Sequence, residues 1–252
     1  MCSTNIHMVN KKTANKPYDS SLTSIGRGIL LVIIPITAYI LGAIPTVLFT
    51  YYILTLIPIT GFLFLIIATL VLFLSFVLFF FCEIFIPALF IRIFNIKTPY
   101  GIHRLSITDK AFFKHMLFFT LYRPALLCTS IIPLVPIRLR LLKIVGLKIG
   151  KGSMIAGTEL IDEPYGVEIG NNTLIGGLST IFAHISHEKL YMKKVKIGNH
   201  CFIGNKSLIM PGVSIEDDVI VEPGTVVGQD QVLKKGKRYH GNPAVELKKN
   251  DG

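Results

Sequence analysis

The sequence predicts an all-β solenoid of short, stacked strands in the C-terminal part of the chain, preceded by membrane-associated α-helices. Three observations lead to this fold class. No charged residue or histidine occurs between Arg27 and Glu83, a stretch of 55 residues. From Ile149 onward an Ile or Val returns every six residues through regular blocks of sequence. The hydrophobic fraction of the chain, 51%, is also too high for an ordinary soluble protein.

The uncharged stretch is long enough for two membrane-spanning helices, because one crossing takes roughly 20 apolar residues. We expect these helices near 28–53 and 60–85, joined by a turn at residues 58–61, where a proline and a glycine occur. Pro35 and Pro45 lie inside the first helix and are expected to kink it. A bilayer tolerates such kinks where neighbouring groups satisfy the freed backbone.

Positive charge flanks this hairpin on both sides, and the connecting turn carries none. Because Lys and Arg are retained on the cytoplasmic side, both termini and the C-terminal domain are expected in the cytoplasm, in a multi-pass protein of the plasma membrane. The apolar stretch is too long for a cleaved signal peptide. The flanking cations are Lys11, Lys12, Lys16 and Arg27 before the hairpin, and Arg92, Lys97, Arg104, Lys110 and Lys114 after it.

The net charge of +11 favours contact with anionic lipid headgroups over nucleic-acid binding. Much of the basic charge flanks the predicted membrane helices, where it orients them and meets the headgroups. No zinc-finger, RRM or helix-turn-helix pattern occurs, so we expect no nucleic-acid partner. The four cysteines, at positions 2, 82, 128 and 201, form no CxxC pair, which is typical of a reduced compartment.

Residues 98–148 are apolar but interrupted, and we expect interfacial or amphipathic helices there. The stretch IRLRLLKIVG (137–146) reads as a short amphipathic helix closed by Gly146, with three cations between its apolar residues. A third crossing at 112–137 stays open, and it would place the C-terminal domain outside the cell. The interrupting residues are Lys114, His115, Arg123, Pro124, Pro133 and Pro136, and the cations of the short helix are Arg138, Arg140 and Lys143.

The C-terminal part repeats with a period of six residues. An α-helix would repeat at 3.6 residues and a simple strand at two. A period of six therefore indicates a short strand and a turn in each repeat, with one aliphatic side chain directed inward. Stacking such units buries a column of Ile and Val side chains that no single unit could bury alone. The aliphatic positions are 149, 155, 161, 169, 175, 181, 197, 203, 209, 215, 221 and 227.

This repeat resembles that of the hexapeptide-repeat acyltransferases. The likeness lies in IGNNTLIGGLST (169–180), in IGNHCFIGNKSLIMPGVSIEDDVIVEPGTVVG (197–228) and in GKRYHGNPAVEL (236–247). The resemblance covers roughly residues 149–248. It implies a left-handed parallel β-helix with three hexads in each coil, a homotrimer, and acyl-CoA in the groove between neighbouring subunits.

In this frame residues 169–186, 197–214 and 215–232 form three regular coils. Residues 149–168 form a looser coil that is two residues too long, at DEPYG (162–166). The predicted divisions of the chain are a cytoplasmic tail at 1–27, the transmembrane hairpin at 28–97, interfacial helices at 98–148, and the β-helix acyltransferase domain with a C-terminal tail at 149–252.

The order of four stretches is also similar to the membrane-bound, acyltransferase-like C-terminal region of polylysine-synthetase-type nonribosomal peptide synthetases. In that group a histidine is followed closely by an acidic residue, in the manner of H-S-x-E. Here His187 comes three positions after His184, and the acid, Glu188, follows one residue later. The four stretches are IRLRLLKIVGLKIG (137–150), LIDEPYGVEIGNNT (160–173), AHISHE (183–188) and YHGNPA (239–244).

The six-residue rhythm breaks after residue 186, where HEKLYMKKVK (187–196) is expected to leave the solenoid as a loop. Such loops leave at corners, where functional groups can converge. By position His184 matches the family's catalytic histidine, and its imidazole would take a proton from an acceptor hydroxyl or amine. His187 is the alternative base, with His184 then structural. Glu188 is either the acid that orients an imidazole or a solvated loop residue.

The resemblance also implies contacts with acyl-CoA. Gly204 and Asn205 would offer backbone amides to the CoA chain or to the thioester oxygen. The backbone around Gly241, Asn242 and Pro243 would border the pantetheine arm. The remaining cofactor candidates are Gly224, together with Lys206 and Lys248, which would meet the CoA phosphates unless they are ordinary surface lysines.

These features predict a membrane-anchored transferase that moves an acyl group, acetyl by preference, from acyl-CoA to a membrane-associated acceptor. The acceptor would offer a hydroxyl or an amine on a lipid-linked glycan, a lipid headgroup or a peptide. We expect no metal ion. Two other functions stay open: a γ-class-like zinc carbonic anhydrase using His184, His187 and His200, and a non-catalytic membrane scaffold.

Overall fold

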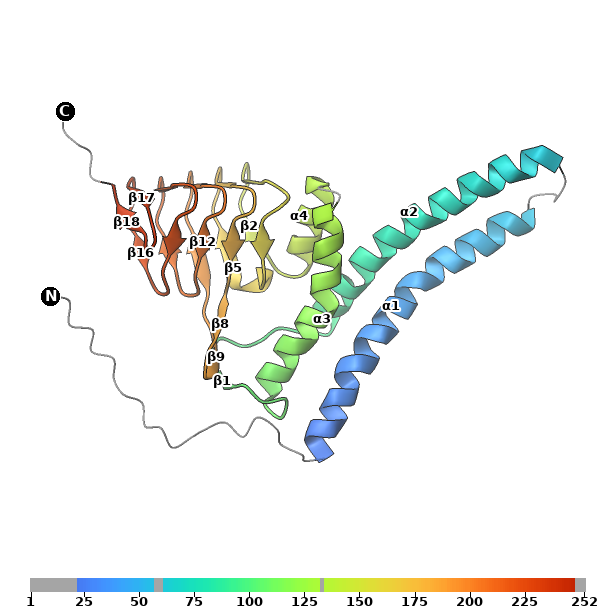
Figure 1. The fold of residues 1–252 in the computed structure, drawn as a ribbon, viewed down its shortest axis with the longest axis horizontal. Helices are drawn as coiled ribbons and strands as arrows, with labels where there is room; N and C mark the ends of the chain where they lie inside the picture. Colours follow the sequence, from blue (N-terminus) through green and yellow to red (C-terminus); the bar gives the residue numbers. More distant parts are fainter. Residues whose placement is uncertain (1–21, 57–60, 132–133, 248–252) are drawn as a thin grey trace.

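Three parts follow one another along the molecule: a helical hairpin, a pair of shorter helices and a β-helix (Figure 1). The computed structural model describes residues 22–56, 61–131 and 134–247. Most of the predicted turn at 58–61 and the candidate Lys248 lie outside these residues.

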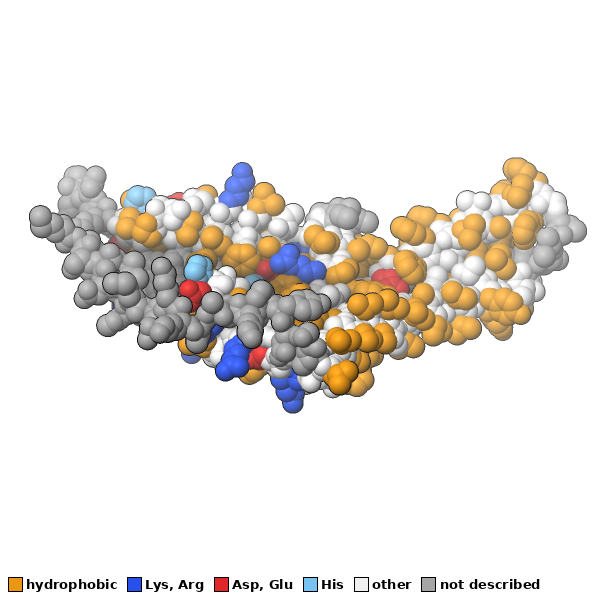
Figure 2. Space-filling view, turned by 60° about the horizontal axis from the view of Figure 1, so that its bottom comes forward, with side chains coloured by type: hydrophobic (Ala, Val, Ile, Leu, Met, Phe, Trp, Pro, Cys, Tyr) orange, Lys and Arg blue, Asp and Glu red, His pale blue; other side chains and the backbone are white. Residues whose placement is uncertain are grey.

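The predicted hairpin consists of α1 (Leu22–Leu56) and α2 (Gly61–Ile93), which are longer than the expected 28–53 and 60–85. Both are long and apolar enough to cross a membrane. Their hydrophobic side chains cover the hairpin end of the molecule, whereas charged side chains gather towards the other end (Figure 2). The first helix continues through both of its prolines and curves gently (Figure 1).

Between the hairpin and the β-helix lie α3 (Lys110–Ile131) and α4 (Val135–Ile144). Phe118 and Leu141 are fully buried in one hydrophobic core with Ile161 of the first coil. Tyr122 donates a hydrogen bond to the Ile161 carbonyl at 2.8 Å. The two helices therefore cover the N-terminal end of the β-helix, where the aliphatic column would otherwise meet water.

The expectation that Pro124 breaks the middle segment is wrong, because α3 runs through it. A proline lacks the N–H that would bond the carbonyl four residues earlier. Here the Tyr39 hydroxyl of α1 donates to that carbonyl, on Thr120, at 3.0 Å. Pro136 instead stands in the first turn of α4, where a proline costs little.

Of the three cations of the predicted amphipathic helix, Arg138 is buried, with 1% of its side chain exposed. Its Nε lies 2.7 Å from a carboxylate oxygen of buried Glu159, and its Nη1 donates to Thr129 and Ser130 of α3. This arginine ties α3, α4 and the first coil together. The predicted end of the helix is confirmed, since Gly146 has a φ of +116° and its N–H bonds back to α4.

The β-helix consists of three sheets of parallel strands, and the twelve predicted aliphatic positions stack in register. Ile169 pairs with Ile197, Ile175 with Ile203, and Ile181 with Ile209. The first sheet holds β2 (Lys148–Ile149), β5 (Val167–Ile169), β10 (Val195–Ile197), β13 (Ser214–Ile215) and β16 (Val232–Leu233); the second holds β3 (Met154–Ile155), β6 (Leu174–Ile175), β11 (Phe202–Ile203), β14 (Ile220–Val221), β17 (Arg238–His240) and the antiparallel β18 (Val245–Glu246); the third holds β4 (Leu160–Ile161), β7 (Thr180–Ile181), β12 (Leu208–Ile209) and β15 (Val226–Val227).

The break in the repeat is a β-hairpin and not the irregular loop expected at 187–196. Its strands are β8 (His184–Ser186) and β9 (Lys189–Met192), and β1 (Gly101–Arg104) adds to the outer edge of β9. Because β1 pairs with β9, a strand from the segment before α3 holds the hairpin in place. His184, which the hexad pattern places on the regular coil, is therefore the first residue of the hairpin.

Candidate active site

His184 and Glu163 face each other at the corner where the hairpin leaves the β-helix. Nδ1 of His184 lies 2.5 Å from Oε1 of Glu163. The other carboxylate oxygen accepts the backbone N–H of Ala183 at 3.1 Å. The Glu163 side chain is fully buried, and 19% of the His184 side chain is exposed. The carboxylate thus occupies one ring nitrogen and leaves Nε2 as the nitrogen that can serve a substrate.

Glu163 reaches this position because the first coil is longer than the others. It precedes a 3₁₀ turn, η1 (Pro164–Gly166), formed by the extra residues of DEPYG. Its carbonyl accepts the N–H of Gly166 at 2.8 Å. A Cβ on Gly166 would lie 2.6 Å from that of Ala183, so this glycine lets the turn pack closely under the hairpin. No local sequence pattern singles out Glu163, although the surplus length of this coil was the available signal.

Aromatic rings from two directions surround the imidazole of His184. The rings of His115 and Phe119, both on α3, lie with their centroids 4.7 and 5.7 Å from it in edge-on arrangements. Phe182 contributes a third ring at 5.9 Å. The side chain of Thr98 approaches Nδ1 of His115 at 3.5 Å. These neighbours restrict the rotation of His184 and exclude much of the solvent around it.

The environment sets the charge that His184 prefers. Burial opposes a charged ring and lowers its pKa, but the contact with Glu163 and the negative charges of Glu163 and Asp162 outweigh burial. The pKa of His184 is therefore raised above its usual 6.5. A proton taken up by this ring is stabilised, which is a useful property in a general base.

The pKa values of the two other ionisable neighbours, His115 and Asp162, are also shifted from their usual values. Burial, with the nearby His184, lowers the pKa of His115 to about 3, so His115 is neutral. Burial and the charge of Glu163 raise the pKa of Asp162 to about 6, although Arg123 opposes this with an ion pair of 2.8 Å. The positive charge of the site therefore forms on His184 and not on His115.

The other residues proposed for proton transfer lie elsewhere. His187 and Glu188 form the turn between β8 and β9 and are exposed. The carboxylate that faces the His184 ring belongs to Glu163. His200 lies at a different corner, between Asn172 at 3.2 Å and Asp218 at 3.5 Å.

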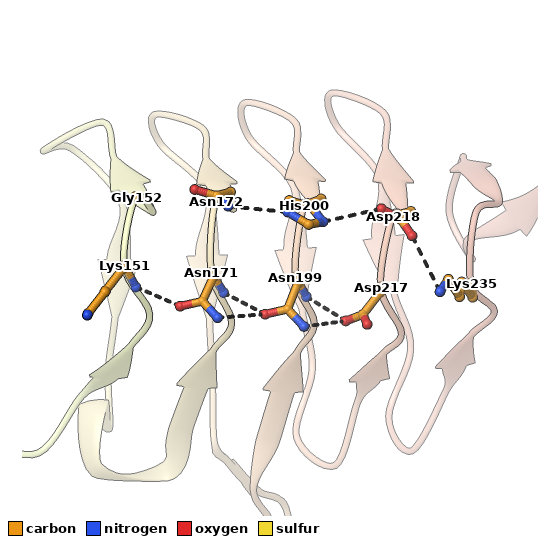
Figure 3. Close-up of a pocket in the computed structure, with 9 residues that line it drawn as sticks. All are labelled: Lys151, Gly152, Asn171, Asn172, Asn199, His200, Asp217, Asp218 and Lys235. Atoms are coloured by element: carbon orange, nitrogen blue, oxygen red, sulfur yellow. Dashed lines mark hydrogen bonds and ion pairs between the residues drawn. The ribbon is translucent and has the colours of Figure 1, made fainter.

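That different corner carries a depression lined by polar side chains, drawn in Figure 3. Asn171, Asn199 and Asp217 form a ladder: Asn171 donates to the Asn199 side chain, and Asn199 donates to the Asp217 side chain, at 2.7 to 3.2 Å. Such a ladder satisfies its own polar groups and holds the coils in register. We therefore attribute the depression to the fold and not to catalysis.

The cofactor candidates lie along the corner between the second and third sheets. The N–H of Gly204 donates to the Val221 carbonyl at 2.8 Å, and the N–H of Gly224 donates to the Asn205 carbonyl at 2.9 Å. These two amides are thus engaged within the β-helix. Beside Gly204 the same corner holds Lys206, which is exposed, and two coils along it holds the loop of Gly241, Asn242 and Pro243.

Comparisons with known proteins bear on the repeat. Residues 194–229 match the family model described as "Bacterial transferase hexapeptide (six repeats)". "Putative acetyltransferase YvoF" of Bacillus subtilis (strain 168) is 38% identical over 101 residues, which cover 38% of this chain and 57% of that protein. The chain thus spans just over half the length of this curated relative.

Solved structures give weaker likenesses. A maltose O-acetyltransferase from Clostridium difficile 630 has a TM-score of 0.39 and 22% identity, over 46% of this chain and 76% of its own. A galactoside acetyltransferase in complex with coenzyme A has a TM-score of 0.37 and 20% identity, over 46% and 70%. With the family match, the predicted fold class is confirmed as a left-handed parallel β-helix of hexapeptide repeats that follows apolar helices. The likeness to polylysine-synthetase-type proteins stays a prediction.

Proposed function

We propose that this protein is a membrane-anchored acyltransferase that uses acyl-CoA, acetyl-CoA by preference, as its donor. The observation that carries the proposal is the pair of His184 and Glu163, at 2.5 Å, on a hexapeptide-repeat β-helix. The 38% identical relative is described as an acetyltransferase, which agrees with this reaction class. An imidazole backed by a buried carboxylate is suited to remove a proton from a hydroxyl or an amine.

In the proposed reaction Nε2 of His184 takes the proton of the acceptor as its oxygen or nitrogen attacks the thioester carbonyl. Glu163 stabilises the imidazolium that forms. The tetrahedral intermediate then releases the CoA thiolate, which recovers the proton from His184. Backbone amides along the groove of a homotrimer stay the predicted donors to the intermediate's oxyanion, with Asn205 as the candidate.

The apolar hairpin supports an acceptor that is itself attached to the membrane. Two helices of this length and composition would hold the β-helix close to the bilayer. With both termini in the cytoplasm, the site would have access to cytoplasmic acyl-CoA and to lipid-linked glycans, lipid headgroups or nascent peptides on the inner leaflet. A freely diffusing acceptor would gain nothing from this anchor.

The test compares three single variants of the full chain in detergent, measuring release of the CoA thiol and mass increments on membrane lipids and glycans. His184→Ala should lower turnover by about 10²–10⁴-fold, the usual contribution of a general base. His187→Ala and Glu188→Gln serve as matched controls from the hairpin turn and should stay within about twofold, as for surface substitutions away from a site. Full activity in His184→Ala would exclude this mechanism. Absence of acyl-CoA binding by the wild type would instead favour a non-catalytic scaffold.

One observation favours a second function, a zinc enzyme. Ligand atoms of His115, Glu163 and His184 lie within 4.8 Å of one another. However, zinc bonds of roughly 2.0–2.1 Å in tetrahedral geometry keep neighbouring ligand atoms more than about 3 Å apart. The 2.5 Å between Nδ1 and Oε1 is too short for two ligand atoms of one zinc ion. Metal analysis of the purified protein separates the two functions, because stoichiometric zinc would support the second.

A further inference from the structure

A shallow depression of about 540 Å³ lies where the C-terminal part of α2 meets α4. None of its lining residues is among the rings that surround His184. Its lining combines apolar side chains with positively charged ones. The lining residues are Phe85, Leu89, Arg92, Arg140, Lys143 and Ile144.

The three cations of this depression come from two helices. Arg92 lies in the last turn of α2, and Arg140 and Lys143 are three positions apart on α4, so both lie on one face of that helix. All three are exposed. Within the part of the chain that the structure describes, none of them forms an ion pair, and no acid lines the depression.

Arg138, on the same helix, differs from these three cations because an acid compensates its charge. Arg138, two positions before Arg140, is buried and paired with Glu159 at 2.7 Å. The three cations of the depression have no such acid. Three like charges around one small depression repel one another, and an anion between them would remove that repulsion.

The apolar side chains narrow the class of anion. Phe85 and Leu89 are four residues apart on α2 and so form one stripe on its surface, and Ile144 faces them from α4. Leu89 is 43% exposed in the isolated chain. A free phosphate or a nucleotide would pair with the cations but leave these apolar side chains exposed to water, whereas an acyl chain would cover them.

We propose that this depression binds one anionic phospholipid, with its phosphate among Arg92, Arg140 and Lys143 and an acyl chain on Phe85 and Leu89. The proposal rests on the membrane anchoring given under the proposed function, since Arg92 lies at the end of the second candidate span, where headgroups would be found. The lipid would fix α4, and with it the β-helix, against the bilayer surface.

The test is native mass spectrometry of the full chain in mild detergent, titrated with phosphatidylglycerol or with phosphatidylcholine of the same acyl chains. The double variant Arg140→Gln with Lys143→Gln removes two of the three cations and should weaken phosphatidylglycerol binding about 25-fold, since each cation near an anionic surface contributes roughly fivefold. Arg92→Gln alone should weaken it about fivefold. The matched control, Lys151→Gln with Lys196→Gln, removes the same charge from exposed positions of the β-helix and should leave binding unchanged.

Three results would overturn the proposal. Equal retention of the two lipids by the wild type would show that the headgroup charge is not recognised. An equal loss in the control double variant would show an effect of net charge alone. Displacement of the lipid by millimolar inorganic phosphate would show a free-phosphate site. None of these depends on acyl transfer, so this test can fail while the proposed reaction stands.

Discussion

Replacing Glu163 by Gln isolates the part of the site that the structure adds to the histidine. Glutamine keeps the size of the side chain and an oxygen that can accept the Ala183 N–H, so the 3₁₀ turn and the hairpin base should keep their structure. The change removes the negative charge that lies 2.5 Å from Nδ1 of His184 and turns an amide NH2 toward that nitrogen. The expected effect is therefore on the proton affinity of His184 and on the rate of the chemical step.

The magnitude follows from the distance and the burial. Charge centres roughly 4 Å apart interact by about 1 kcal/mol in water and by about 4 kcal/mol at an effective dielectric constant of 20. Glu163 is fully buried and His184 is 19% exposed, which places this pair nearer the second value. Since about 1.4 kcal/mol is a factor of ten, kcat should fall about 10²- to 10³-fold, with an unchanged KM for acyl-CoA.

The pH dependence of kcat gives an independent measure of how the Glu163 charge affects His184. The reaction needs neutral His184, so kcat rises with pH through the pKa of this residue, which Glu163 and Asp162 hold above 6.5 in the wild type. Without the Glu163 charge, burial dominates and the pKa falls, so the rising limb should move to lower pH. A Glu163→Gln variant within twofold of wild-type kcat, or with an unmoved limb, would refute the assignment of Glu163 as the positioning residue.

Three further predictions concern stability, each checked by thermal unfolding of the full chain in detergent. Arg138→Ala should lower stability by about 3–5 kcal/mol, because it leaves the buried Glu159 carboxylate without its partner; an unchanged melting temperature would contradict this. Ile209→Ala opens a cavity in the aliphatic column and should cost about 2–5 kcal/mol, and a loss under 1 kcal/mol would show that the coils collapse around it. Tyr39→Phe removes the donor to the Thr120 carbonyl and should cost about 1 kcal/mol, with a larger loss pointing to a role beyond this bond.

The sequence was informative where one physical rule repeats. Each hexad must place one aliphatic side chain inward, so the period predicted which residues form the buried column. The pairs of Ile181 with Ile209 and of Ile203 with Val221 follow from the three hexads per coil that the family resemblance implies. The apolar hairpin was equally readable, because a bilayer demands a long run without charge. Helix ends and the effect of Pro124 were harder to predict from the sequence, since they depend on partners such as Tyr39 from another helix.

The site was predicted only in part. His184 stood out because it lies in the last regular hexad before the break. Glu163 lies about twenty residues earlier and did not stand out, because an acid in an over-long coil has no local pattern that ties it to a histidine one coil later. The pairing of β1 with β9 was hidden for a similar reason, since an antiparallel edge strand can come from any distance along the chain.

By itself, then, the sequence determined the buried aliphatic column of the solenoid and the position of its interruption, because these follow from a repeating pattern of burial. Only the tertiary structure decided the electrostatics of the candidate site. It placed the buried carboxylate of Glu163 against His184, and it brought the neutral His115 from α3 to the same ring. The physical reason is that a pKa depends on charges and burial in space, and these come from segments that the order of residues does not place side by side.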